Sequence, residues 1–263
     1  MKEKTIIICG CTKNSERYIE NHLEKLYSLY SYCKKLHMVI YENNSVDDTK
    51  EKLRDFSKNN ENVHLLLETV EIKPQKGIYQ KPYFLAYARN KLLSYIRKKI
   101  VQFDYIVMVD LDNVISNFEP FKFYQTMEKY KTIDWDVLTA NSDYNYYDIW
   151  ALRINENIWN SRIHEKLWKS PIDYDCWQMG NPEKYVFANK INIPTDFNCL
   201  IPVNSAFGGL AIYKSKAIKN CHYSAYSEGK ITCEHVFFHH QILTLNQGKI
   251  FICPDLIVKS QSR

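Results

Sequence analysis

The chain has few glycines and lacks long runs of apolar or like-charged residues. Only 7 of its 263 residues are glycine. No apolar stretch approaches the roughly 20 residues that a membrane-spanning helix needs. No run of one charge is long enough to suggest an arm that binds nucleic acid. These absences exclude an integral membrane protein and give no sign of a nucleic-acid partner, whereas peripheral association with a membrane stays open.

Two further absences concern processing and domain organisation. Residues 1–14 enter an apolar segment directly and lack a secretory signal pattern, and Cys9 and Cys11 have no second pair at zinc-finger spacing. We therefore expect reduced thiols and a cytoplasmic protein. The chain also lacks internal repeats and low-complexity linkers, which predicts one domain over residues 1–263, with a nucleotide-binding half at 1–113 and an acceptor-binding half at 114–263.

The residues that are present indicate a globular protein with a mixed helix and strand pattern. Hydrophobic residues make up 45% of the chain and charged residues 25%, and the net charge is +5. A mild positive excess favours an anionic substrate, but it is also common on proteins that bind no anion. Short apolar runs alternate with amphipathic stretches, which predicts an α/β fold with a mainly parallel sheet.

The predicted elements follow from apolar spacing along the chain. We expect strands at residues 5–10, 37–42, 63–68, 103–112, 136–140, 210–214 and 249–253. We expect helices at residues 15–29, 47–58, 83–98, 155–169 and 233–245. Residues 170–202 show no clean period.

The sharpest chemical signal is the pair Asp110 and Asp112, placed where an apolar strand meets the edge of the sheet. Residues two apart in an extended segment face the same side, so both carboxylates can enter one cleft. Mn2+ or Mg2+ would relieve the repulsion between them, because such ions take one or two carboxylates and complete their shell with phosphate oxygens and water. The alternative is that both aspartates only cap the following turn.

Several further segments resemble one family in the right order. The chain resembles GT-A glycosyltransferases, and within them the group containing fungal capsular alpha-1,3-mannosyltransferases, with a weaker similarity to the yeast Golgi mannosyltransferase complex subunits. The matching segments are residues 9–14, 41–49, 88–93, 110–112, 150–153, 204–209 and 233–235.

This resemblance implies a Rossmann-like, three-layer α/β/α GT-A fold around a mainly parallel central sheet. It also implies a glycosyltransferase that uses a UDP- or GDP-sugar, a glycan or glycoprotein acceptor and Mn2+ or Mg2+. Asp110 and Asp112 are the expected metal ligands. The residues predicted to bind substrate are Cys11, Lys13, Asn14, Glu42, Asn44, Asp47, Arg89, Asn90, Arg153, Asn204, Ser205, Gly208 and Gly209.

A late cluster adds a predicted acid and a predicted third metal ligand. His235 and His239 lie one helical turn apart, and Glu234 stands at the start of the same predicted helix. The resemblance implies that Glu234 is the general base if the reaction inverts configuration, or that it orients substrate if configuration is retained. Of the two histidines we favour His239 as a metal ligand, and a structural role for the cluster is the alternative.

Two other functions stay open at this stage. A sugar nucleotidyltransferase can also use an acid pair and a metal, although the segment at residues 9–14 is a poor match to the glycine-rich basic loop of those enzymes. A non-catalytic carbohydrate-binding protein on the same fold is favoured only by the 20 tyrosines and 5 tryptophans.

Overall fold

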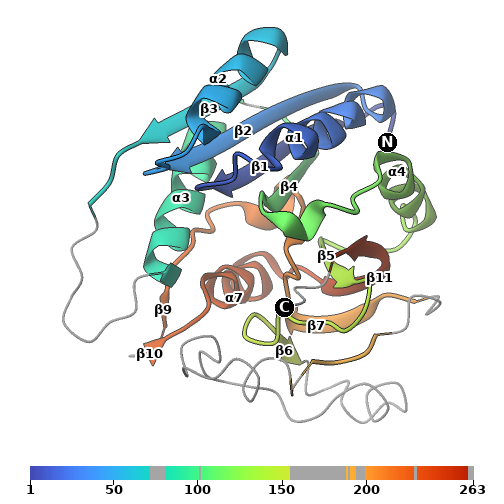
Figure 1. Ribbon diagram of the computed structural model, residues 1–263. Helices are drawn as coiled ribbons and strands as arrows, with labels where there is room; N and C mark the ends of the chain where they lie inside the picture. The colour runs from blue at the N-terminus through green and yellow to red at the C-terminus, as the bar shows by residue number, and fades with distance from the viewer. Residues whose placement is uncertain are drawn as a thin grey trace.

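A mixed nine-stranded sheet forms the centre of the molecule, as a computed structural model shows (Figure 1). The structure describes residues 1–71, 81–100, 102–154, 188, 190–193, 199–227 and 230–259. The expected helix at residues 155–169 and most of the segment without a clean period lie outside these residues.

The described elements follow one another along the chain as strands β, helices α and short 3-10 helices η. They are β1 (Thr5–Thr12), α1 (Ile19–Tyr27), η1 (Ser28–Tyr32), β2 (Lys35–Asn43), α2 (Thr49–Asn59), β3 (Val63–Glu68), α3 (Lys81–Lys99), β4 (Tyr105–Asp110), η2 (Asn113–Ile115), α4 (Pro120–Lys129), β5 (Val137–Ser142), β6 (Arg153–Ile154), β7 (Ile201–Ser205), β8 (Leu210–Lys214), η5 (Ser215–Ile218), β9 (Tyr226–Ser227), β10 (Lys230–Ile231), α7 (Glu234–Asn246) and β11 (Ile250–Val258).

The sheet has the strand order β3-β2-β1-β4-β8-β5-β11-β7-β6, and every strand except β8 and β7 runs in the same direction. This arrangement confirms the predicted α/β fold with a mainly parallel central sheet. The carboxyl ends of β1, β2, β4 and β5 therefore share one edge of the sheet, where open α/β sheets bind their ligands.

Helices cover both faces of the sheet because side chains along each strand alternate between them. On one face Ile7 and Cys9 join the core that includes residues of α3 and α7. On the other face Ile6 and Ile8 join the core that includes residues of α1, α2 and α4. Figure 1 shows α1 and α2 above the blue strands and α3 and α7 on the opposite side. The predicted three layers are confirmed.

Strand β8 and the glycine before it connect β4 to β5 near the middle of the sheet. β8 lies between β4 and β5 and is antiparallel to both, with Val109 of β4 paired with Leu210 of β8. The amide of Asp110 continues this ladder by donating to the carbonyl oxygen of Gly209 at 2.9 Å. The segment before β8 is thereby fixed against the end of β4.

No helix among the described residues is both long and apolar enough to cross a membrane. The seven cysteines in the described part of the chain are all free thiols.

Candidate active site

A cavity of about 320 Å3 opens where β1 and β2 end and α3 begins. It is lined by Cys11, Thr12, Lys13, Asn43, Lys81, Phe84, Leu85 and Ala88. Two of these, Cys11 and Lys13, are substrate-binding candidates from the sequence, whereas Asn43, Lys81 and Phe84 are not. Burial raises the pKa of the Cys11 thiol to about 12, so this cysteine is a neutral wall of the cavity.

Two asparagines shape the loops beside this cavity. Asn14 and Asn44 both have positive φ angles, 51° and 56°, a conformation that asparagine tolerates better than most residues. The Asn14 side chain accepts from the amide of Val46 at 3.0 Å, which ties the loop after β1 to the loop after β2. The Asn44 amide group donates to Val70 at 3.0 Å and accepts from it at 2.9 Å. These paired bonds hold the side chain of Asn44 against the backbone of Val70, and its predicted contact with substrate stays a prediction.

Two acids of the same loop also have local partners. Asp47 accepts from the amide of Thr49 through Oδ1 and from the amide of Glu16 through Oδ2, each at 3.1 Å. Asp47 therefore joins the backbone at the start of α2 to the loop after β1, and its assignment as a substrate ligand stays a prediction. Glu42 is fully buried and accepts from the amide of Ser45 at 2.7 Å, while its Oε2 receives no hydrogen bond from the described residues.

Asp110 and Asp112 stand at the carboxyl end of β4, and their carboxyl groups interact. Asp112 begins η2 and accepts from the amide of Val114 at 2.9 Å, so its capping role is real. Burial, and then the nearby Asp110 carboxylate, raise the pKa of Asp112 to about 6. Neither side chain is sealed away, since Asp110 is 33% exposed and Asp112 is half-buried. The two carboxyl groups thus share a partly open environment, and their role as metal ligands stays a prediction.

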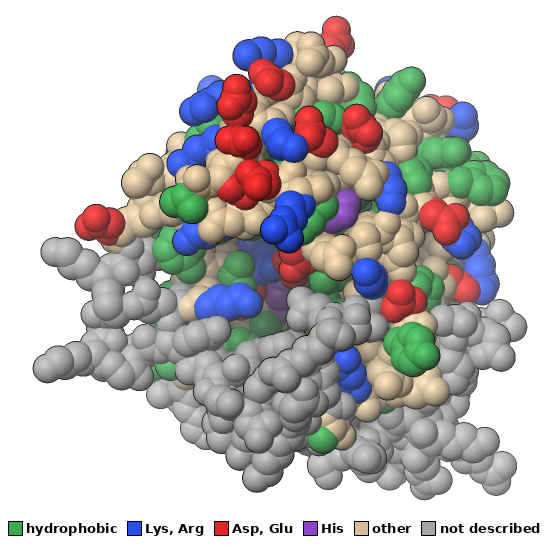
Figure 2. Space-filling model, viewed as in Figure 1, with side chains coloured by type: hydrophobic (Ala, Val, Ile, Leu, Met, Phe, Trp, Pro, Cys, Tyr) green, Lys and Arg blue, Asp and Glu red, His purple; other side chains and the backbone are tan. Residues whose placement is uncertain are grey.

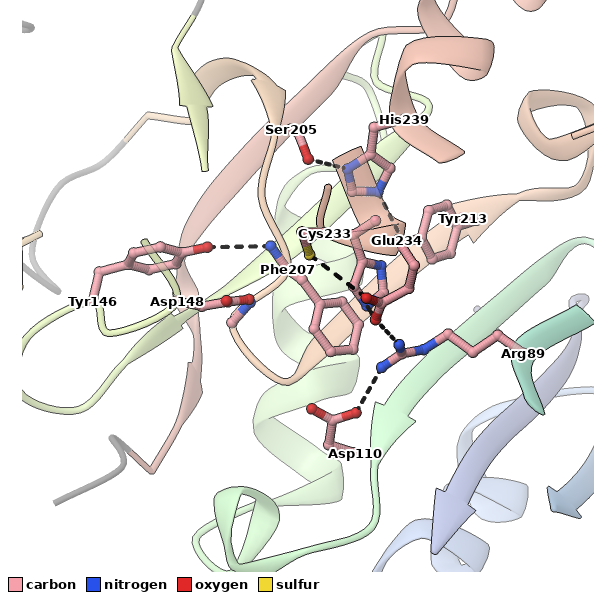
Figure 3. Close-up of polar contacts among 12 residues, drawn as sticks. Arg89, Asp110, Tyr146, Asp148, Ser205, Phe207, Tyr213, Cys233, Glu234 and His239 are labelled. Atoms are coloured by element: carbon pink, nitrogen blue, oxygen red, sulfur yellow. Dashed lines mark hydrogen bonds and ion pairs between the residues drawn. The ribbon is translucent and has the colours of Figure 1, made fainter. Parts of the chain in front are cut away.

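A buried arginine joins this pair to α7 (Figure 3). Arg89 of α3 donates to Oδ1 of Asp110 at 3.0 Å and forms an ion pair with Glu234, whose side chain is 3% exposed. Burial acts to lower the pKa of Arg89, but Glu234 and Asp110 outweigh it and raise the pKa above its usual value. Arg89 is therefore a fixed cation between two acids, and the ring of Phe207 lies 5.3 Å from its guanidinium carbon.

A third acid, Asp148, faces the same centre and escaped the sequence analysis. Its Oδ2 accepts from the amide of Gly208 at 2.9 Å. Burial raises the pKa of Asp148 to about 6, the Gly208 amide opposes this, and the charges of Asp110 and Glu234 raise it further. Its position just before the matched segment at residues 150–153 was the one available signal in the sequence.

Gly208 and Gly209, two predicted substrate-binding residues, adopt backbone conformations that favour glycine. Their φ angles are +68° and +89°. A Cβ on Gly208 would lie 2.7 Å from the carbonyl oxygen of Ala140, and one on Gly209 would lie 2.4 Å from a methyl group of Val114. The double glycine therefore fits a crowded turn that joins β7 to β8 and packs against β5 and η2. The amide that donates to Asp148 belongs to this turn.

His239, the histidine that the sequence analysis favours as a metal ligand, lies in a buried, hydrogen-bonded position. His239 is fully buried, with Ser205 Oγ 2.9 Å from its Nδ1 and the Tyr213 hydroxyl 3.0 Å from its Nε2. Both ring nitrogens are thus occupied, and His239 links α7 to β7 and β8. Ser205, a predicted substrate ligand, is 1% exposed, and its hydroxyl contacts the histidine.

Three further candidates from the sequence are Asn90, Arg153 and Asn204. Asn90 donates to the carbonyl oxygen of Tyr223 and accepts from its amide, both at 2.8 Å, so its amide group holds a backbone segment and is not available to a substrate. Arg153 donates to the carbonyl oxygens of Trp150 and Leu152 at 2.9 and 2.7 Å, which stabilises its own turn. Asn204 is half-buried.

The acid pair suits a divalent cation by its chemistry. Among the described residues, no three His, Cys, Asp or Glu side chains gather closely enough to hold a metal ion by themselves. Arg89 and Val114 each contact only Oδ1 of their aspartate, so Asp110 and Asp112 keep a second oxygen for another partner. Carboxylate oxygens at the same strand end are suitable ligands for Mg2+ or Mn2+ when phosphate oxygens and water supply the rest.

The space-filling view places these charges together. In Figure 2 a hollow near the middle of the face shows acidic, basic and histidine side chains side by side. Lys81, at the start of α3, acts electrostatically on this group and lowers the pKa values of Asp110, Asp112 and Glu234 against the opposing effect of burial.

Solved structures share this fold at low sequence identity. A mannosyltransferase from Pyrobaculum calidifontis in complex with GDP-Man and Mn2+ is 12% identical, with a TM-score of 0.55 over 99% of this chain and 57% of that one. Residues 1–349 of TarS from S. aureus are 16% identical, with a TM-score of 0.52 over 98% of this chain and 59% of that one.

A third structure, glucosyl-3-phosphoglycerate synthase from Mycobacterium tuberculosis with Mn2+, UDP and phosphoglyceric acid, is 11% identical, with a TM-score of 0.51 over 99% of this chain and 72% of that one. The chain thus spans less than two thirds of the length of the first two structures.

A search among curated proteins finds no match. The model of one protein family matches residues 5–187, and the chain therefore belongs to glycosyl transferase family 2.

Proposed function

We propose that this chain transfers a glycosyl group from a nucleoside diphosphate sugar to an acceptor hydroxyl, with Asp110 and Asp112 as the ligands of a divalent cation. The observation that carries the proposal is the partly exposed acid pair at the carboxyl end of β4, next to the cavity at the ends of β1 and β2. Cys11 of the cavity wall pairs with Asp110 in the register of β1 and β4, so the two features adjoin.

The cavity fits the nucleoside diphosphate part of such a donor. Its volume of about 320 Å3 falls within the usual range of small-molecule sites, roughly 300 to 1,000 Å3. Lys13 and Lys81 line it and supply positive charge for the phosphates, while Phe84 and Leu85 supply apolar surface for the base. Lys81 also stands at the start of a 19-residue helix, where the helix dipole favours an anion.

The residues around the acid pair hold it ready for the ion. Arg89 donates to Oδ1 of Asp110, and the Val114 amide donates to Oδ1 of Asp112. Glu234 keeps Arg89 charged and in place from the opposite side. When bound, the cation would neutralise the charge that develops on the departing nucleoside diphosphate.

The donor and the division of the chain form part of the proposal. GDP-mannose and UDP-sugars are the first donors to test, because one similar structure contains GDP-Man and another contains UDP, and because the sequence resembles the fungal capsular mannosyltransferases. We place the nucleotide in residues 1–113, which supply the cavity and both aspartates, and the acceptor in residues 114–263. The acceptor class we propose is a glycan or a protein-linked glycan.

The test is sugar transfer by the folded protein and by Asp112→Asn. The wild type is incubated with Mn2+, GDP-mannose or UDP-glucose and a panel of p-nitrophenyl glycosides, and products are separated by mass. We expect transfer with at least one donor, complete dependence on the cation, and a loss of about 100-fold or more in Asp112→Asn. Full activity of Asp112→Asn would remove the metal-site proposal, and release of pyrophosphate from an NTP and a sugar phosphate would indicate a nucleotidyltransferase instead.

A further inference from the structure

The role of Asp148 follows from how the turn at Gly208 holds it. Asp148 lies between β5 and β6, and in Figure 3 its carboxylate points toward the group formed by Arg89, Glu234 and Asp110. The side chain is half-buried, and its Oδ2 accepts from the Gly208 amide at 2.9 Å. The carboxylate therefore has a fixed position at the rim of the site.

The double glycine sets Asp148 and Asp110 on either side of one turn. Gly208 donates its amide to Asp148, and Gly209 accepts the amide of Asp110 at 2.9 Å. A Cβ at either glycine would meet backbone or side-chain atoms at 2.7 Å or less. The backbone of this turn therefore contacts both acids, and a reaction between two bound molecules requires groups that are held in place in this way.

Glu234 is poorly placed to accept a proton from an acceptor. Its side chain is 3% exposed, and its Oε1 forms the ion pair with Arg89. The thiol of Cys233 lies 3.8 Å from its other oxygen. A general base must reach the hydroxyl that it deprotonates, so a carboxylate enclosed by α3 and α7 is unsuited to this step.

Asp148 differs from Glu234 in its exposure, since it is half-buried, and in its partners. Among the described residues, no Lys, Arg or His side chain forms an ion pair with it. The titratable groups that interact with it are Asp110, Glu234, Tyr146, Tyr147 and Cys233, and the two acids act to raise its pKa. A carboxylate without a guanidinium partner is a better proton acceptor than one held by a guanidinium.

We propose that Asp148 is the base that deprotonates the acceptor hydroxyl, and that Glu234 is a positioning residue that acts through Arg89. This inference rests on the proposed function. The acceptor oxygen forms a bond to the anomeric carbon of the donor. The bond from that carbon to the phosphate oxygen breaks, and its electron pair leaves with the nucleoside diphosphate. The hydroxyl proton passes to the Asp148 carboxylate and then to water.

The variant Asp148→Asn separates this role from a purely structural one. The carbonyl oxygen of asparagine can still accept from the Gly208 amide, so the turn is kept, whereas the amide group cannot take a proton. Asp148→Ala can neither accept from the Gly208 amide nor take a proton. This variant is used for chemical rescue by formate, a small carboxylate that can enter the space left by the side chain. Glu234→Gln tests the positioning role, because it removes the charge that faces Arg89.

The experiment measures donor binding and turnover for the same proteins. Titration calorimetry with Mn2+ gives the affinity for GDP-mannose and UDP-glucose. Turnover is followed as transfer to p-nitrophenyl glycosides and as donor hydrolysis, in which water takes the acceptor's place. We expect Asp148→Asn to bind donor within about 3-fold of wild type while kcat falls about 100-fold or more. We expect formate to restore part of the turnover of Asp148→Ala, and Glu234→Gln to weaken donor binding.

Three results would overturn the inference. Asp148→Asn could keep its kcat within about 3-fold, it could lose donor affinity in proportion to turnover, or formate could leave Asp148→Ala unchanged while Glu234→Ala is rescued. Wild type that neither binds nor turns over any donor would instead overturn the proposed function, and this inference with it. Circular dichroism of each variant confirms that the compared proteins are folded.

Discussion

At the scale of single residues, the centre of the site is a buried arginine that forms ion pairs with two acids. Arg89 lies between Asp110 and Glu234 and is 2% exposed. Removing one partner of such a buried pair leaves an uncompensated charge, which costs about 3 to 5 kcal/mol. The same arrangement leaves Asp112 and Asp148 without a cationic partner in the described residues, and both have pKa values raised to about 6.

The raised pKa of Asp112 predicts how stability depends on pH in the absence of metal. The folded protein binds this proton more tightly than the unfolded chain, so the stabilising contribution is complete below the unfolded pKa and is lost as the pH rises through about 6. We expect metal-free Asp112→Asn to be more stable than wild type at pH 7.5, by about 1 to 2 kcal/mol after solvent screening, and equal to it near pH 4.

Denaturant unfolding at both pH values, with EDTA and with Mn2+, measures this difference. Mn2+ should stabilise wild type at pH 7.5 and leave Asp112→Asn nearly unaffected. Asp55→Asn, on the exposed side of α2, is the matched control. A stability gain of equal size at both pH values would show that the effect has another origin than the charge on Asp112.

At the scale of elements, α7 is fixed to the sheet by a buried polar bridge. His239 connects α7 to Ser205 of β7 and to Tyr213 of β8. Burial lowers the pKa of His239 to about 3, so the ring is neutral and can serve as donor on one nitrogen and acceptor on the other. The bridge holds the start of α7, and with it Glu234, against Arg89.

Replacing this histidine tests its structural role against metal binding. We expect His239→Leu to lower the free energy of unfolding by about 2 to 4 kcal/mol, because two buried hydroxyl groups lose their partner. The Mn2+ affinity of the folded variant should match that of wild type. Leu245→Ala, at an exposed position of the same helix, is the control. A tenfold loss of Mn2+ affinity in folded His239→Leu would restore the histidine as a ligand.

The elements also show what sequence patterns can and cannot predict. The strands at β1 to β4 and the helices α2, α3 and α7 match the expected ranges to within a few residues, because apolar periodicity records which side of each segment is buried. The same periodicity placed His235 and His239 on one helical face but carried no information about Ser205 and Tyr213. Strand direction was also invisible, since β8 and β7 run against the others.

Some residues of the candidate site could also be predicted from the sequence, and others could not. Asp110 and Asp112 could be predicted because an apolar strand that ends in acids is a local feature of the sequence. Asp148 and Lys81 could not, because they reach the site through loop and helix ends whose positions depend on the whole fold. Asn44, Asp47 and Asn90 resemble ligands in sequence, yet each satisfies backbone groups of a neighbouring loop.

At the scale of the whole molecule, the sheet brings two distant parts of the chain to one edge. Residues up to Asp112 contribute the cavity and the acid pair, and residues from Asp148 to Glu234 contribute the acids that face it. The ladder between β4 and β8 joins these parts at Asp110 and Gly209. A donor held by the first part would therefore meet an acceptor held by the second across one turn.

The central claim is that the acid pair binds a cation together with a nucleoside diphosphate. Its most direct test is calorimetric titration of wild type, Asp110→Asn and Asp112→Asn with GDP and with UDP, in Mn2+ and in EDTA. We predict that wild type binds at least one nucleotide only in Mn2+ and that each substitution weakens this binding about 10-fold or more. Binding that is equal in Mn2+ and EDTA, or unchanged in Asp112→Asn, would contradict the account.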